Sequence, residues 1–162
     1  MHGGFAKKYD LNVLEDYEGA NGAGHQALAG ELENGKLQYI SKDGTNENGG
    51  VYGDSKYTDK VFNNINEIND YYGTNVSPGK RYDIVATYRL TKSQMNTALT
   101  TARTYAHQTY NLFTNSCTTI VEKALYNAFK PRYTLFSPIP NASFQKQQFS
   151  YRNYLSSVKT IN

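Results

Sequence analysis

Two residues of this sequence have side chains suited to nucleophilic catalysis, Cys117 and His25. Cys117 is the only cysteine, so it cannot form a disulfide within the chain. It follows the polar segment 114–116 and precedes a run with apolar residues at helical spacing, Ile120, Val121, Ala124 and Leu125. We therefore expect Cys117 in the first turn of a helix. There the helix dipole and the free backbone N–H groups favour thiolate, which predicts a thiol pKa below about 8.5.

The chain has three histidines, and elimination selects one of them as the partner of the thiol. His2 lies in the Gly-rich start MHGG, which is typical of a frayed terminus. His107 falls on a predicted helix but away from its apolar stripe, which indicates a solvated side chain. His25 follows Gly24 and opens a segment of small residues against which a helix could pack closely. His25 is therefore the candidate general base.

Composition sets broad limits on the function. The 162 residues suit one domain, 38% of them are hydrophobic, and no apolar run approaches the length of a membrane span. No signal-peptide pattern is visible. The net charge of +3 comes from dispersed Lys and Arg, so it gives no argument for nucleic acid.

The pattern of the chain predicts an α+β fold in which a small antiparallel sheet supports the cysteine helix. Segments 24–31 and 36–42 form a predicted hairpin around Asn34 and Gly35. Residues 81–90 are typical of a strand, and Thr91 with Gln94 forms a capping box for a helix over 92–105. The whole chain is interpreted as a lead-in (1–22), a catalytic core (23–130) and an extended C-terminal segment (131–162) with a short amphipathic stretch at 149–158. Within the core, we also expect a polar loop or lid (41–60) and a short helix (61–68).

The motifs GAGHQAL, YISKDG and Y-x4-N-x-C, in this order, resemble the circularly permuted papain-like cysteine hydrolases, which include NlpC-type amidases and lecithin-retinol-acyltransferase-like proteins. The histidine strand followed by Tyr-x-Ser-Lys-Asp-Gly is similar to C-terminal toxin domains of bacterial Rhs and type VI secretion effectors. The likeness covers roughly residues 22–130. One departure is that Ser116 stands directly before the cysteine, where the family usually has Asn.

The resemblance implies a role for each candidate residue. Cys117 would be the nucleophile and His25 its general base, with the backbone N–H of Cys117 as one oxyanion donor. The residue that orients the imidazole would come from the second arm of the hairpin, where the candidates are Gln38, Ser41 and Asp43. We favour Ser41, because it shares a strand face with the apolar residues of that arm. No metal or cofactor is assigned.

Three classes of function remain open from the sequence. The first is a cysteine amidase or peptidase that cuts cell-wall peptide bonds as an antibacterial effector. The second is a lipid-directed hydrolase or acyltransferase on the same scaffold. The third is a non-enzymatic interaction module in which Cys117 is merely buried. The effector resemblance also implies delivery into a target cell as part of a larger protein, and a cognate immunity protein in the producing cell.

Overall fold

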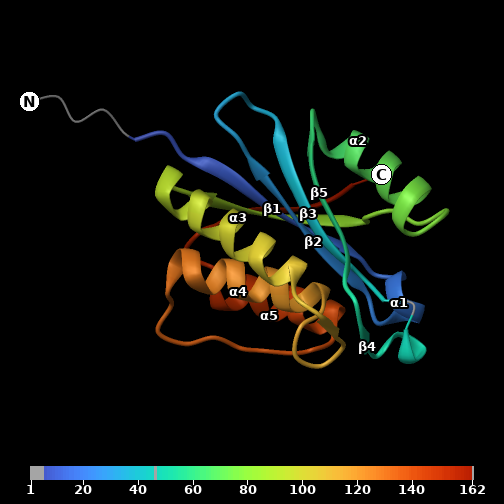
Figure 1. Ribbon diagram of the computed structural model, residues 1–162. Coiled ribbons are helices and arrows are strands. Elements are labelled where there is room, and N and C mark those ends of the chain that lie inside the picture. The colour runs from blue at the N-terminus through green and yellow to red at the C-terminus, as the bar shows by residue number, and fades with distance from the viewer. Residues whose placement is uncertain (1–5, 46, 162) are drawn as a thin grey trace, which may run out of the picture.

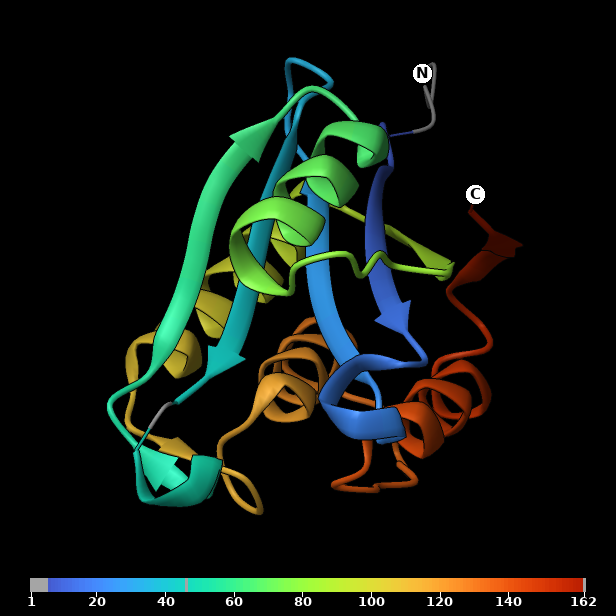
Figure 2. The same cartoon turned by 90° about the vertical axis from the view of Figure 1, so that its right-hand side faces the viewer.

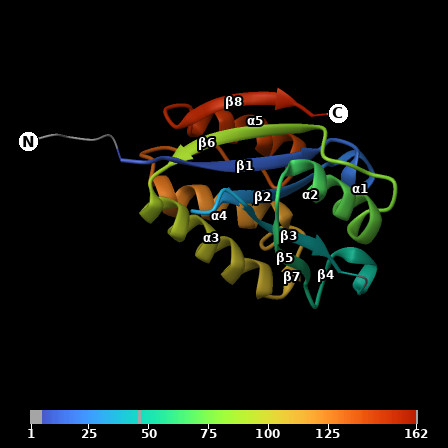
Figure 3. The same cartoon turned by 90° about the horizontal axis from the view of Figure 1, so that it is seen from above.

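The computed structural model describes residues 6–45 and 47–161, and it is an α+β structure built on a six-stranded antiparallel sheet (Figure 1). The strands of this sheet are β1 (Tyr9–Asp16), β2 (His25–Glu31), β3 (Leu37–Gly44), β5 (Lys56–Phe62), β6 (Ile84–Leu90) and β8 (Leu155–Thr160). Their order is β5-β3-β2-β1-β6-β8, which Figure 3 shows from above. The short strands β4 (Tyr52–Gly53) and β7 (Tyr110–Asn111) form a separate pair.

Helices cover both faces of the sheet. The helical elements are α1 (Gly19–Gly22), the 3-10 turn η1 (Asn48–Gly50), α2 (Ile65–Tyr71), the π-helical turn η2 (Tyr72–Val76), α3 (Lys92–His107), α4 (Cys117–Phe129) and α5 (Pro140–Ser150). Figures 1 and 2 show α3, α4 and α5 on one face and α2 on the other. Among the described residues, no helix combines the length and the apolar character needed to cross a bilayer.

The central strand β2 is buried on both faces because each face packs against a different hydrophobic cluster. Leu28 belongs to the cluster under α3 and α4, whereas Ala27 and Ala29 belong to the cluster under α2. α3 crosses β2 at Gly30, where an added Cβ would lie 2.8 Å from side-chain atoms of Met95 and Leu99. The absence of a side chain at Gly30 leaves room there for the ends of the Met95 and Leu99 side chains.

Several predicted elements are confirmed. The hairpin is β2 and β3, paired from Ala27 with Ser41 to Glu31 with Leu37. The strand over 81–90 is β6. The capping box starts α3, with the Thr91 hydroxyl accepting from the Gln94 N–H at 3.1 Å and the Gln94 side chain accepting from the Thr91 N–H at 2.9 Å.

Other predicted elements differ from the structure. The segment interpreted as a lead-in contains β1, which lies inside the sheet between β2 and β6. The polar loop contains most of β5, an edge strand whose polar sequence is explained by its exposure to solvent. The short helix begins later, at Ile65, after the Asn64 cap. At the C-terminus the amphipathic stretch is divided between the end of α5 and the start of strand β8.

Candidate functional site

Cys117 is the first residue of α4, as its sequence context predicts. Ser116 precedes the helix in an extended conformation, and its N–H donates to the Thr119 hydroxyl at 3.0 Å. The cysteine is 8% exposed, and the backbone of Gln26, next to His25 on β2, hydrogen-bonds the thiol. The start of α4 therefore packs against the start of β2.

The thiol pKa differs in direction from the sequence expectation. Burial raises the pKa of Cys117 to about 11, and the hydrogen bonds from Gln26 and Thr118 only partly oppose this effect. The helix terminus was expected to favour thiolate, but removal of the sulfur from water is the larger influence. In the free protein Cys117 is therefore a neutral thiol.

His25 is the first residue of β2, and its ring is enclosed by aromatic side chains. It stacks on Tyr72 and Tyr82 with ring centroids 5.5 and 6.0 Å away. Burial lowers the pKa of His25 to about 4, so the imidazole is neutral at physiological pH. A neutral imidazole has one ring nitrogen free to accept a proton, which a general base requires.

The imidazole is linked through Ser41 to a buried carboxyl group. His25 Nε2 lies 3.1 Å from Ser41 Oγ, and the Ser41 hydroxyl donates to Asp43 Oδ1. The second oxygen of Asp43 accepts from the Thr58 hydroxyl at 3.0 Å. Burial raises the pKa of Asp43 to about 6, against the lowering effect of these two hydroxyl groups. Because Nε2 faces Ser41, Nδ1 is the ring nitrogen that remains available to accept a proton from a thiol.

Of the three candidates for the orienting residue, the structure places Ser41 directly against His25. Asp43 is 3.9 Å from His25 Nε2 and lies behind Ser41. Gln38 is opposite Gly30 in the hairpin, and its amide donates to Asp59 at 2.5 Å, away from the imidazole. The side-chain alternation of the hairpin thus brings together His25, Ser41 and Asp43 and excludes Gln38.

Cys117 and His25 line one cavity of about 340 Å³ at the end of the sheet. Its walls come from the loop before β2, the end of β3, the turn after α2, the segment before α4, and the segment that enters α5. Most of this lining is apolar. It includes Val76, Leu112, Phe113 and Ile139, the last three of which are 41%, 65% and 53% exposed. The cavity is therefore open to solvent on an apolar rim.

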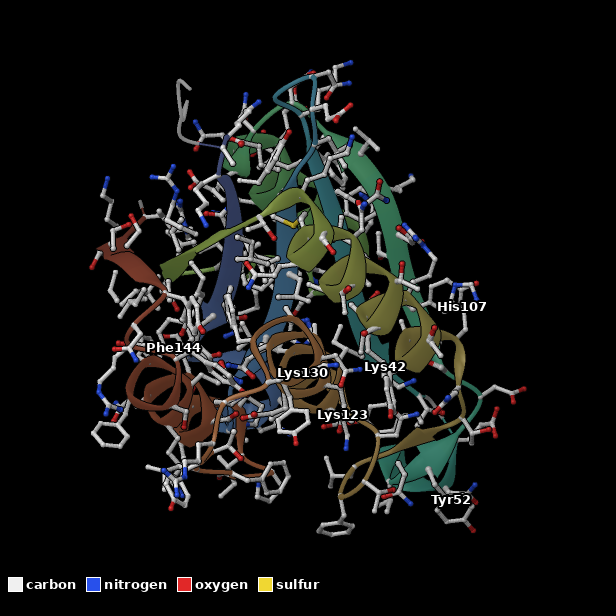
Figure 4. The ribbon with its side chains drawn as sticks, turned by 90° about the vertical axis from the view of Figure 1, so that its left-hand side faces the viewer. Lys42, Tyr52, His107, Lys123, Lys130 and Phe144 are labelled. Carbon is white, nitrogen blue, oxygen red and sulfur yellow. The ribbon has the colours of Figure 1, made fainter. Side chains whose placement is uncertain are left out.

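His107, the other histidine among the described residues, does not line this cavity. His107 ends α3 and stacks on Tyr57 with centroids 4.2 Å apart, and Figure 4 shows it at the periphery of the molecule. His2 lies outside the described residues.

Sequence reasoning missed two buried ionisable groups beside the site. Lys42 lies on β3 beyond the C-terminal end of α3, where its Nζ donates to the carbonyls of Tyr105, Ala106 and Gln108 at 2.8, 3.1 and 2.6 Å (Figure 4). Glu15 is fully buried on β1. The available signal for Glu15 was a carboxyl group at an apolar position of the alternating segment Leu11, Val13, Glu15, but that segment was interpreted as a lead-in.

Comparisons with known proteins identify a similar fold but no family. No family model matches the sequence, and no curated protein is significantly similar to it. Among solved structures, the chain is similar to the type VI secretion system effector TseH, with a TM-score of 0.56 and 11% sequence identity. The match covers 96% of this chain and 98% of TseH. At this identity the likeness shows a shared fold.

Proposed function

We propose that this protein is a cysteine hydrolase in which Cys117 is the nucleophile and His25 the general base. The observation that carries the proposal is that both side chains line one open cavity, while His25 is held from behind by Ser41 and Asp43. A thiol that lines the same cavity as an oriented neutral imidazole is the arrangement that nucleophilic catalysis requires.

The neutral state of both groups defines how the reaction would start. His25 takes the proton of Cys117, directly or through one water, as the sulfur attacks the substrate carbonyl. The oxyanion that forms accepts from the N–H of Cys117, which has no acceptor within the helix because it belongs to the first turn. Protonated His25 then gives its proton to the leaving amine, and a thioester remains on the sulfur. Water, deprotonated by His25, cleaves the thioester and restores the thiol.

The proposed substrate is a peptide bond of the bacterial cell wall, and the proposed role is that of an effector toxin. The fold shared with TseH supports this role, because that protein is a type VI secretion effector. On this proposal the domain is delivered into a target cell as part of a larger effector, and a cognate immunity protein protects the producing cell. The papain-like assignment remains part of the proposal, since it rests on the GAGHQAL, YISKDG and Y-x4-N-x-C motifs.

The test is digestion of purified peptidoglycan, with the products analysed by mass spectrometry. Wild-type protein should release fragments with new amine and carboxyl ends, whereas Cys117→Ala should release none. In parallel, the domain should be toxic when directed to the periplasm and harmless in the cytosol. Periplasmic toxicity that persists in Cys117→Ala would refute the enzymatic proposal and support an interaction module instead.

A second candidate, a lipid-directed hydrolase or acyltransferase, is favoured by the apolar rim of the cavity. Leu112, Phe113 and Ile139 could accommodate an acyl chain beside the thiol. Release of fatty acid from phospholipid vesicles, with intact peptidoglycan in the parallel digest, would select this candidate. Phe113→Asp should then lower lipid hydrolysis more than hydrolysis of a short soluble ester.

A further inference from the structure

Glu15 and Asn141 place unpaired oxygen atoms in the same small space beside the site. A Cβ built on Gly24 would lie 2.2 Å from Asn141 Oδ1 and 2.6 Å from Glu15 Oε1. Within residues 6–45 and 47–161, these two atoms and Glu15 Oε2 are buried and none makes a hydrogen bond of normal geometry, although the Gln26 side chain lies close to the carboxyl group. Gly24 itself has φ of +99°, so a side chain there would be strained as well as obstructed.

The orientation of the Asn141 amide is fixed by two other contacts. Its Nδ2 donates to the backbone carbonyls of Tyr17 and Gly22, both at 3.1 Å. Turning the amide over would place its oxygen against both carbonyls, so Nδ2 must keep its present position. Asn141 Oδ1 therefore points away from those carbonyls, into the space beside Gly24 where Glu15 Oε1 also lies, and needs a donor there. A carboxylate cannot donate, whereas a carboxylic acid can.

We propose that Glu15 is a positioning residue that stays protonated in the folded protein and donates its proton to Asn141 Oδ1. This bond would join strand β1 to the start of α5. Asn141 also donates its backbone N–H to the Ala23 carbonyl at 3.2 Å, so the same residue holds the loop that leads to His25. The cavity walls on both sides of this junction, the segments 20–24 and 138–140, would be fixed relative to Cys117.

The surroundings of Glu15 agree with a protonated group. Burial raises the pKa of Glu15 to about 9, the neighbouring Gln26 amide partly opposes this, and Asp16 and Asp83 raise the pKa further. The groups around Glu15 come from every neighbouring element: Asp16 at the end of β1, Tyr17 after it, Gln26 on β2, Asp83 before β6, Cys117 on α4 and Asn141 on α5. None of these is a cation, so none of them compensates an ionised Glu15.

The raised pKa of Glu15 determines the direction in which the stability of the folded protein changes with pH. Between pH 4.5, the ordinary pKa, and about 9, the folded protein keeps a proton that the unfolded chain has lost. Stability should therefore fall as pH rises across this window. Glu15→Gln is neutral at every pH, and its amide can still donate to Asn141. The melting temperature of this variant relative to wild type should rise by about 3 °C for each pH unit in the window.

The experiment combines infrared spectroscopy, melting curves and, because the positioning role rests on the proposed function, hydrolysis. At pH 7.5 wild type should show the C=O stretch of a protonated carboxyl group, which is lost in Glu15→Gln. Glu15→Gln should keep kcat/KM within about threefold, whereas Glu15→Ala should lose about tenfold or more through misplacement of the cavity walls. Absence of the protonated band, or a Glu15→Gln variant less stable than wild type at pH 8, would overturn the proposal. The spectroscopic and melting results do not depend on activity, so they stand apart from a failure of the hydrolase assay.

Discussion

The ionisation of Cys117 is the property through which the proposed mechanism is best tested. Burial raises the pKa of this thiol from 9.0 to about 11. At pH 7.5 that change lowers the thiolate fraction by about 100-fold relative to an exposed cysteine. We expect iodoacetamide to modify the folded protein at least 100-fold more slowly than a free thiol at this pH, with the rate rising about tenfold per pH unit to beyond pH 10.

His25→Ala separates two ways of activating the sulfur. Since His25 is neutral in the free protein, its removal should leave the alkylation profile unchanged within a few fold while strongly lowering turnover. Cys117→Ala gives the background, because the chain has no other cysteine. A wild-type rate that reaches a plateau below about pH 8, and loses it in His25→Ala, would refute the reasoning. That outcome would mean that the resting state is an imidazolium–thiolate pair.

Three further outcomes follow from the geometry of the site. Loss of His25 as the base should cost about 10²- to 10⁴-fold in kcat/KM in His25→Ala. His107→Ala should have no effect, because His107 stacks on Tyr57 and does not line the cavity, and equal losses would contradict the assignment. Ser41→Ala should lower the rate by about tenfold because the imidazole loses its support, and Gln38→Ala should not; the reverse order would contradict the observed hairpin register. The pH profile of kcat/KM should fall below about pH 6, because protonated Asp43 is a weaker acceptor for the Ser41 hydroxyl, and this step should be missing from the profile of Asp43→Asn.

The sequence was sufficient wherever the determining interactions are local. The Thr91 and Gln94 capping box involves groups three residues apart, and α3 starts where it predicts. The hairpin follows from strand alternation around Asn34 and Gly35. The same alternation placed Ser41 near His25, and it made Gln38 the residue that would replace Ser41 if the register were different. The position of Cys117 at a helix start follows from the polar residues before it and the apolar spacing after it.

Non-local pairing and burial could not be read in the same way. β1 is a strand because β2 and β6 border it, and its sequence alone was compatible with a lead-in. The pKa of Cys117 depends on how much water the packed structure removes from the sulfur, and this reversed the expected direction. The Glu15 and Asn141 side chains lie beside the same glycine, Gly24, although 126 positions separate them in the chain, so no local pattern could connect them.

The sequence by itself therefore determined the residues that can do chemistry, a single thiol and one histidine in a glycine-rich setting, because side-chain type and local spacing define them. Only the tertiary structure decided that both line one cavity, that Asp43 stands behind Ser41, and that the thiol is neutral at rest. These features depend on which segments pack together and exclude water. Packing of this kind involves contacts between residues that are distant in the sequence, and local sequence patterns do not specify such contacts.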